Sequence, residues 1–406
     1  MYFLYRDSFI LMTTPFIQYN KLSLILICLI ILGSGCASYK TKTNTTTTSL
    51  KNTHTIQAVN LKTLESLATI STKLARHRVI FVGENHTNYG DHLNQLAVIK
   101  QLHQHWGNKT TIGLEMIQQP YQRYLNQYIA GQITEKQMLK KTEWYKRWKY
   151  EFRLYRPIFN YAKQNKIALV ALNIPTEVTH KISKVGIKKL ATQDRAFLPS
   201  IIDRSNKAYL KRLSAVFAQH FHTRSKGIKL FIDAQLGWDE GMAFAATKYL
   251  QAQPAKNMII LAGSGHVINY AGIPDRLDRQ LKTQSAVILN NVTGKMNKGS
   301  GNYALLRSTK SLPPIGYFGI TMKPANSKGV LISKVLNNSA AKKAGLRKGD
   351  LIIRLNNHII QDDTDFRLFS ETTQPNENVV ITIRRGNKRQ SLNLLLQKKP
   401  NRFIMP

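Results

Sequence analysis

The chain has 406 residues, too many for one ordinary domain, and 43% of them are hydrophobic, which fits a globular protein with a buried core. Lys and Arg outnumber Asp and Glu by 59 to 22, so anionic partners are favoured unless the charge only reflects a proteome of high average pI. The two cysteines, Cys28 and Cys36, lie in the N-terminal segment, which excludes a disulfide framework and a cysteine-rich metal site elsewhere.

The N-terminal segment has the features of a signal peptide. Lys21 precedes an apolar run over residues 22–32, and small residues follow it up to Cys36. The run is shorter than the roughly 20 residues of a membrane-spanning helix. Small residues before a cysteine resemble a lipobox, although Gly33 stands where a large apolar residue is usual. We predict that residues 1–36 are a lipoprotein signal peptide and that Cys36 carries lipid. A signal peptide cleaved without lipidation and an uncleaved anchor are the alternatives.

The region around this segment refines the prediction. Met12 would make a more ordinary start, because the first eleven residues fit a signal peptide poorly. Ala37 after the cysteine resembles the pattern that sorts lipoproteins to the outer membrane. Residues 37–60 are rich in Thr, Asn and Lys and cannot bury enough apolar surface to fold. We therefore expect a polar tether between the lipid and the first domain.

Residues 61–308 show strand and helix signals in alternation. Short apolar runs that suit strands buried on both faces lie at 78–83, 111–116, 167–173, 257–263 and 285–290. Helical patterns lie at 92–105, 121–129, 154–165, 207–221 and 241–251. The alternation predicts an α/β domain with a mainly parallel sheet and flanking helices.

Residues 312–399 follow a proline-marked linker and have a different pattern. Strand signals lie at 317–322, 329–335, 350–355, 379–384 and 391–396, with helices expected only at 339–344 and 364–370. This pattern predicts a separate small β-rich domain.

Four ionisable residues are expected at one edge of the α/β sheet. Ligands of open parallel sheets bind outside the carboxyl ends of the strands, and Glu84, His86, Glu115 and His266 follow or end such strands. Carboxylate and imidazole groups are ligands for Zn, Mn, Co or Fe, and together they can act as an acid/base pair. Each alone could be an ordinary satisfied polar residue. The set predicts a functional site and leaves open a metal, an organic ligand or catalysis.

Long sequence blocks at 81–92, 113–131, 142–158, 169–175 and 261–276 resemble the ChaN family of haem-binding lipoproteins, over about residues 65–295. The resemblance implies haem binding for iron acquisition, with the haem as a stacked pair between two chains and therefore a homodimer. The wider superfamily includes Tiki proteases and erythromycin esterases, whose motif matches Gly83 to His86, Glu115 and His266. A metal-dependent hydrolase is thus the alternative, and enzyme activity stays open.

Haem needs an iron ligand, apolar walls and cations for its propionates. Tyr209 and His220, on a basic helical segment, are candidate iron ligands, and Trp238 is a candidate wall. The alternatives are an ordinary surface helix and a core tryptophan.

The C-terminal domain resembles a PDZ domain of the type found with bacterial proteases, through GYFGI at 316–320 and AGLRKGDLI at 344–352. The resemblance implies that a peptide C-terminus adds as a strand and that its carboxylate binds the loop Tyr317, Phe318, Gly319 and Ile320. The helix at 364–370 would wall the groove, with Phe366 or Phe369 inside it. The alternative is a domain that only packs on its neighbour.

The expected location is the cell envelope, with the chain lipid-anchored to the outer membrane and facing the periplasm or the surface. Nucleic acid is not an expected partner despite the charge, because a signal peptide removes the chain from it and no recognition module is visible.

Overall fold

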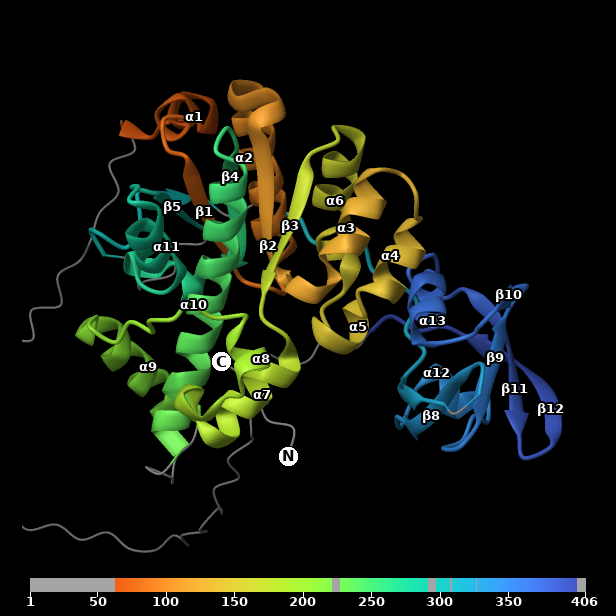
Figure 1. The fold of residues 1–406 in the computed structure, drawn as a ribbon. Helices are drawn as coiled ribbons and strands as arrows, with labels where there is room; N and C mark the ends of the chain where they lie inside the picture. Colours follow the sequence, from red (N-terminus) through yellow and green to blue (C-terminus); the bar gives the residue numbers. More distant parts are fainter. Residues whose placement is uncertain (1–62, 221–226, 291–296, 307–308, 326, 400–406) are drawn as a thin grey trace, which may run out of the picture. The chain divides into compact units, whose positions relative to one another are not determined.

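The structure, a computed structural model, describes residues 63–220, 227–290, 297–306, 309–325 and 327–399. The predicted signal peptide, Cys36 and the tether lie outside these residues. The described chain contains two sheets, each with its own core (Figure 1).

The first sheet has six strands and is parallel throughout. Its strands are β1 (Val79–Glu84), β2 (Thr110–Gln118), β3 (Ala168–Asn173), β4 (Asn257–Gly263), β5 (Ala286–Asn290) and β6 (Tyr303–Leu305). They lie in the order β3-β2-β4-β1-β5-β6, which confirms the predicted α/β class. The order places the carboxyl ends of β1, β2 and β4 side by side.

Helices flank this sheet on both faces (Figure 1). They are α1 (Leu67–Leu74), α2 (Tyr89–Trp106), α3 (Gln122–Ile129), α4 (Glu135–Lys141), α5 (Trp144–Arg147), α6 (Arg156–Gln164), α7 (Thr176–Val185), α8 (Thr192–Arg195), α9 (Lys207–His220), α10 (Ile228–Ala252) and α11 (Ile273–Leu281). Short 3-10 turns join several of them, and η7 (Ser264–His266) directly follows β4.

The strands are apolar on both faces because helices cover both. Ile80 and Val82 of β1 pack with α1, α2, α3 and α6, whereas Val79 and Phe81 pack with α10 and α11. The alternation of side chains along a strand produces this division. Continuous burial explains why these strands could be recognised as unbroken apolar runs.

Helix α10 is longer than the sequence predicts. The expected helix begins at residue 241, but the observed one begins at Ile228. Its first half contains Asp233, Asp239 and Glu240, which are all buried. Because these acids interrupt the apolar period, the sequence pattern hides the start of the helix.

The second sheet belongs to the C-terminal domain. Its strands are β7 (Ile320–Pro324), β8 (Val330–Val335), β9 (Leu351–Leu355), β10 (His358–Ile359), β11 (Asn378–Arg385) and β12 (Lys388–Leu395), and its helices are α12 (Ala340–Lys343) and α13 (Asp363–Ser370). The strands are antiparallel in the order β12-β11-β9-β8-β7, with β10 paired to β9. Strand β7 therefore lies at an edge of this sheet.

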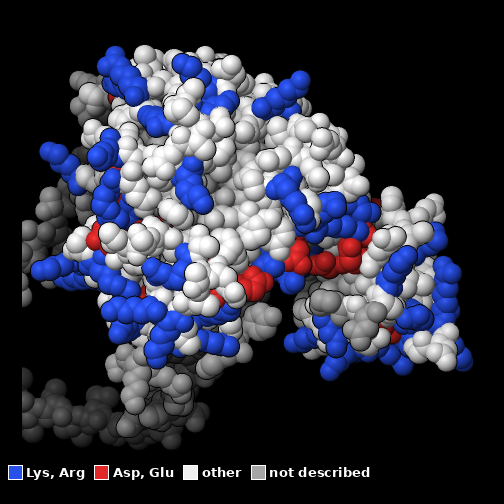
Figure 2. Space-filling model, viewed as in Figure 1, with Lys and Arg blue, Asp and Glu red and all other residues white. Residues whose placement is uncertain are grey.

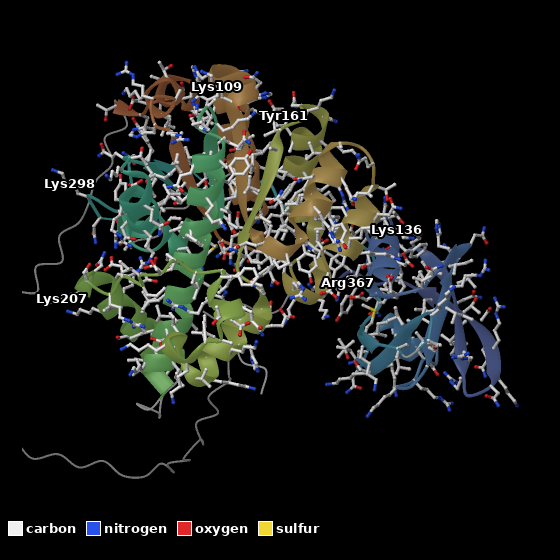
Figure 3. All side chains as sticks on the ribbon, viewed as in Figure 1. Lys109, Lys136, Tyr161, Lys207, Lys298 and Arg367 are labelled. Carbon is white, nitrogen blue, oxygen red and sulfur yellow. The ribbon has the colours of Figure 1, made fainter. Side chains whose placement is uncertain are left out.

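Basic side chains are spread over the surface. Figure 2 shows Lys and Arg over the visible face of both domains, and Lys109, Lys207 and Lys298 project outward as exposed side chains (Figure 3). Among the described residues, no helix combines the length and the apolar character needed to cross a bilayer.

Candidate functional site

The loop after β1 is fixed by hydrogen bonds to the start of α2. Asn88 caps α2 by accepting a hydrogen bond from the backbone N–H of Asp91. The Asp91 carboxylate accepts the N–H of Asn85 at 2.9 Å. A short polar N-cap of this kind satisfies N–H groups that the helix itself leaves unpaired. The loop therefore holds His86 in a defined place beside Glu84, the last residue of β1.

Glu84, His86 and Glu115 come together at this edge of the sheet, as the sequence predicts. His86 Nδ1 donates to Glu84 Oε1 at 2.5 Å. One ligand-type atom from each of the three residues lies within 4.8 Å of the others. Glu84 Oε2 is buried and has no hydrogen-bond partner among the described residues. A buried carboxylate oxygen without a partner is costly, and a cation or a donor from a ligand would satisfy it.

His266 approaches the same group from η7. Its Nε2 lies 3.4 Å from Glu115 Oε1. Glu115 Oε2 accepts the backbone N–H of Gly263 at 2.6 Å. A Cβ on Gly263 would lie 2.9 Å from His86 Cε1, so this position needs a glycine for the site to close.

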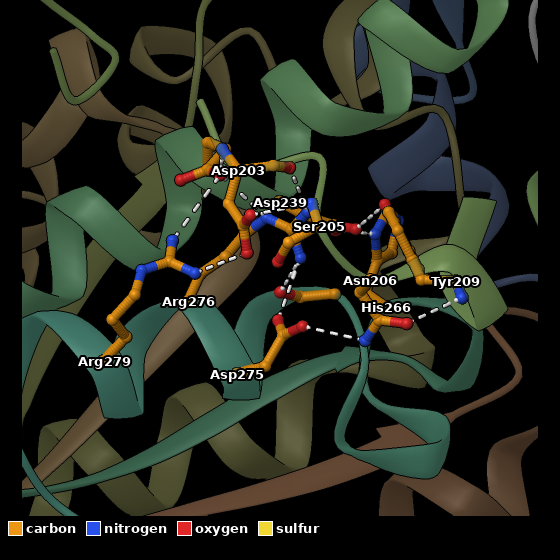
Figure 4. Close-up of polar contacts among 11 residues, drawn as sticks. Asp203, Ser205, Asn206, Tyr209, Asp239, His266, Asp275, Arg276 and Arg279 are labelled. Atoms are coloured by element: carbon orange, nitrogen blue, oxygen red, sulfur yellow. Dashed lines mark hydrogen bonds and ion pairs between the residues drawn. The ribbon is translucent and has the colours of Figure 1, made fainter. Parts of the chain in front are cut away.

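Asp239 of α10 completes the arrangement, although it is not among the site residues that the sequence predicts. Asp239 Oδ1 accepts from His266 Nδ1 at 2.5 Å, and Oδ2 accepts from the hydroxyl of Tyr209 (Figure 4). The side chain is 1% exposed. The sequence feature that could have pointed to Asp239 is an acid directly after Trp238 in a largely apolar helix. We call Glu84, His86, Glu115, Asp239 and His266 the carboxylate–imidazole cluster.

The carboxylates favour positive charge on both histidines. Burial disfavours a charged imidazole, but the charges of Asp239 and Glu115 outweigh it and raise the pKa of His266 to about 9. Burial also opposes charge on His86, yet the hydrogen bond and charge of Glu84 raise the pKa of that ring. Both imidazoles are thus oriented and polarised by carboxylates on their Nδ1 side.

Aromatic side chains border the two histidines. Trp148 meets the His86 ring edge-on with centroids 4.8 Å apart, and Tyr150 lies 4.9 Å from it. Trp238 meets the His266 ring at 6.4 Å. The side chains of His86 and His266 are 19% and 13% exposed, whereas those of the carboxylates are almost fully buried. The imidazoles, and not the acids, are what the cluster presents to solvent.

The structure places the other haem candidates differently. Tyr209 points inward, is 2% exposed and donates its hydroxyl to Asp239. Burial and the charge of Asp239 raise the pKa of Tyr209 well above its usual value, so the phenol stays protonated. The role of Tyr209 as an iron ligand stays a prediction. The observed conformation does not favour it, because the hydroxyl is buried and bonded to Asp239. His220 ends α9, and its side chain lies outside the described part of the chain.

A second buried network supports the cluster from behind. Arg276 of α11 is 1% exposed, and its Nε lies 3.1 Å from Glu240 Oε1. The two side chains form an ion pair, but their geometry is not that of a hydrogen bond. Its guanidinium also donates to the Gly272 carbonyl at 2.8 Å and lies 4.8 Å from the centre of the Tyr209 ring. This arginine ties α11 to α9 and α10.

The C-terminal domain presents its predicted loop beside a free strand edge. Gly319 has a φ of +76°, and a Cβ there would meet the Ser339 side chain at 2.1 Å. In the described residues, the N–H groups of Phe318 and Gly319 make no hydrogen bond. They are available to a carboxylate next to the unpaired edge of β7. Phe366 and Phe369, expected inside the groove, are both buried in the core of the domain, and the Phe366 ring lies 4.9 Å from that of Phe318 in the loop. Their place in the groove stays a prediction.

Each of the two domains matches a known protein family. The family described as haem-binding uptake, Tiki superfamily, ChaN matches residues 70–277. The PDZ domain family matches residues 316–396, so the C-terminal region is a PDZ domain. Among curated proteins, the serine endoprotease DegS of Haemophilus influenzae is 31% identical over 87 residues, and a probable periplasmic DegP-like serine endoprotease of Brucella suis is 27% identical over 97. Each alignment covers 21% of this chain and only 26% and 19% of those proteins, respectively.

A solved structure supports the fold of the larger domain. The structure described as cofacial haem binding to ChaN of Campylobacter jejuni aligns with a TM-score of 0.50 at 18% identity. It covers 60% of this chain and 92% of that protein. The matched family region holds every member of the carboxylate–imidazole cluster. The chain therefore belongs to the haem-binding uptake family of the Tiki superfamily, the family of ChaN.

Proposed function

We propose that this chain binds haem for iron acquisition, beside the carboxylate–imidazole cluster. The observation that carries this proposal is the pair of partly exposed histidines, each held by a carboxylate and each next to a tryptophan. Haem sites combine an iron donor, apolar or aromatic walls and cations for the propionates. The described residues supply a candidate for each need, with His86 for the iron, Trp148 and Trp238 as walls and His266 as a cation.

The two histidines suit different parts of the ligand. An imidazole donates to iron once its nitrogen is unprotonated, and His86 is the more exposed of the two. His266 carries positive charge at neutral pH because its pKa is raised to about 9, and a cation suits a propionate. In this proposal, iron is acquired in the form of the haem that the chain binds.

Hemin titration of the purified chain tests this proposal. We expect a shifted Soret band that saturates at a defined stoichiometry, with weaker binding in His86→Ala and His266→Ala. His180→Ala, which removes an exposed imidazole from α7, is the matched control and should bind as the parent does. An unshifted Soret band, or equal binding by all three variants, would refute it. Light scattering with and without hemin tests the predicted homodimer.

A metal-dependent hydrolase is the second candidate, favoured by one observation. Glu84, His86 and Glu115 gather three donor atoms around the unsatisfied Glu84 Oε2. Imidazole and carboxylate donors suit Zn, Mn, Co or Fe. The comparisons support haem and give no support to a bare metal, so this candidate rests on geometry alone. Elemental analysis of the purified chain, and peptidase or esterase assays with each metal, should show activity lost in Glu84→Gln if it is right.

For the PDZ domain we propose capture of a peptide or protein C-terminus at the free edge of β7. The loop N–H groups of Phe318 and Gly319 would bind the carboxylate, and the peptide backbone would pair with β7. A peptide library should show enrichment that depends on the free carboxylate. If amidated peptides bind equally well, capture of C-termini is ruled out.

We also propose that the chain is an envelope lipoprotein anchored through Cys36 to the outer membrane. Support comes from the apolar run and the small residues before that cysteine. Cells expressing the full chain should incorporate labelled palmitate, and Cys36→Ser should abolish the incorporation while Cys28→Ser does not. Incorporation that survives Cys36→Ser would contradict the anchor.

A further inference from the structure

One face of the PDZ sheet carries a continuous row of side chains across five strands. The pairing register places Arg389 of β12 next to Arg384 of β11, and Arg384 next to Leu351 of β9. Leu351 is next to Leu331 of β8, which in turn is next to Lys323 of β7. The row thus has cations at both ends and two leucines in the middle.

A hollow lies along this row. It has a volume of about 420 Å³, and its lining includes Lys323, Leu331, Leu351 and Arg384. Leu351 is 6% exposed, and Leu331 is half-buried. The leucines lie between Lys323 on one side and Arg384 on the other. The hollow therefore combines an apolar centre with a cationic rim.

The positive charge of this face is not neutralised by nearby acids. Within the described part of the domain, Lys323, Arg384 and Arg389 form no ion pair, and Arg384 donates only to the Ser327 hydroxyl at 3.2 Å. Asp350 is buried and is held by Arg385 at 2.7 Å. Two arginines directly opposite each other on neighbouring strands repel. Residues 312–399 hold fifteen Lys and Arg against six Asp and Glu, and Figure 2 shows many of these cations on the visible surface.

Exposed apolar side chains share this face. Val380 is 42% exposed and Leu395 is 56% exposed. Their neighbours Val379, Ile381 and Leu394 are fully buried, which shows that the alternate positions of β11 and β12 point to the core. A free phosphate ion would need only the cations. The combination of cations, exposed aliphatic side chains and an apolar hollow suits an anionic amphiphile.

We propose that this outer face of the PDZ sheet docks on a membrane of anionic phospholipid. A lipid phosphate lies between Lys323 and Arg384, and the apolar part of the lipid contacts Leu331 and Leu351. The peptide groove uses the edge of β7 and the side of the sheet covered by α13, so a lipid and a peptide can bind together. The site is independent of haem binding.

The test uses the full chain with a single fluorescent label. Residues 37–406 contain no cysteine, so Cys28→Ser and Cys36→Ser remove both thiols of the chain. Adding Asn387→Cys then gives one labelling position, in the exposed turn between β11 and β12. An environment-sensitive dye there reports contact of the PDZ face with lipid, whatever the N-terminal apolar run does. We expect a dye response to phosphatidylcholine vesicles that contain phosphatidylglycerol and none to phosphatidylcholine alone.

Matched variants separate this face from general charge. Arg384→Gln with Arg389→Gln should raise the lipid concentration at half-response roughly 25-fold, since each cation near an anionic surface contributes about fivefold in affinity. Lys398→Gln with Lys399→Gln removes the same charge from exposed residues after β12 and should change it by less than about twofold. Unchanged circular-dichroism melting of both variants shows that they are folded.

Three outcomes overturn the proposal. The first is an equal dye response to both vesicle types, and the second is equal weakening of the response by the two double variants. Saturable binding of inorganic phosphate that Arg384→Gln with Arg389→Gln removes, together with no dye response to either vesicle type, would show a free-anion site instead. Leu331→Asn adds a readout, because it should weaken vesicle binding and leave the melting temperature of the chain nearly unchanged.

Discussion

Replacing Arg276 by methionine removes a buried cation and leaves its partners in place. The guanidinium lies at 3.1 Å from Glu240 and 2.9 Å from Asp275, and Glu240 is fully buried. Breaking a buried ion pair by removing one partner costs about 3–5 kcal/mol, because the remaining charge has no compensation. We expect Arg276→Met to lose stability by that amount, and Arg276→Met with Glu240→Gln to recover at least half of it.

Urea unfolding followed by tryptophan fluorescence measures this loss. All four tryptophans lie in the α/β domain, so the signal reports that domain alone. With a slope of about 2 kcal/mol per molar urea, the midpoint should fall by roughly 1.5–2.5 M. Arg76→Met, which removes an exposed arginine after α1, is the control and should shift the midpoint little.

The loss should also depend on pH. Burial raises the pKa of Glu240, and the charge of Arg276 opposes this rise. Without Arg276 the folded-state pKa of Glu240 moves further above its unfolded value, so the folded state is relatively favoured at low pH and loses stability as pH rises through that pKa. The deficit of Arg276→Met should therefore shrink as pH falls. A deficit below about 1 kcal/mol, or a double variant no better than the single one, would refute this account.

Three further changes test the site and both domains. Gly263→Ala places a Cβ 2.9 Å from His86 Cε1. It should clearly weaken hemin binding in a Soret titration and change the melting temperature only slightly. Burial opposes the charge of Asp203, but hydrogen bonds and a nearby guanidinium lower its pKa. Asp203→Asn should therefore reduce the free energy of unfolding, measured in urea at pH 7, by about 1–3 kcal/mol. This difference from the parent should fade as pH drops through the lowered pKa. Gly319→Ala combines a φ of +76° with a 2.1 Å contact to Ser339 and should cost about 1–3 kcal/mol and abolish peptide binding measured by fluorescence anisotropy.

The sequence determined the strands and the edge at which the site forms. Unbroken apolar runs marked β1 to β5 because each is buried on both faces, and the polar residues that follow them had to meet at one sheet edge. Glu84, His86, Glu115 and His266 were found in this way. The block AGLRKGDLI carried the PDZ resemblance, since its glycines occupy backbone positions that few other residues tolerate.

Only the tertiary structure decided which groups bind each other within the site. Asp239 reaches His266 from α10, 27 residues away in the chain, and no local period marks a buried acid as a partner. Tyr209 lies on a basic helical segment, which predicts a side chain available to bind iron. In the structure it points inward, where its hydroxyl donates to Asp239 and its ring packs on Arg276. The leucine and arginine row of the PDZ sheet likewise exists only through strand register. Periodicity fixes which side chains share a face of one element, whereas contacts between elements depend on how the whole chain packs.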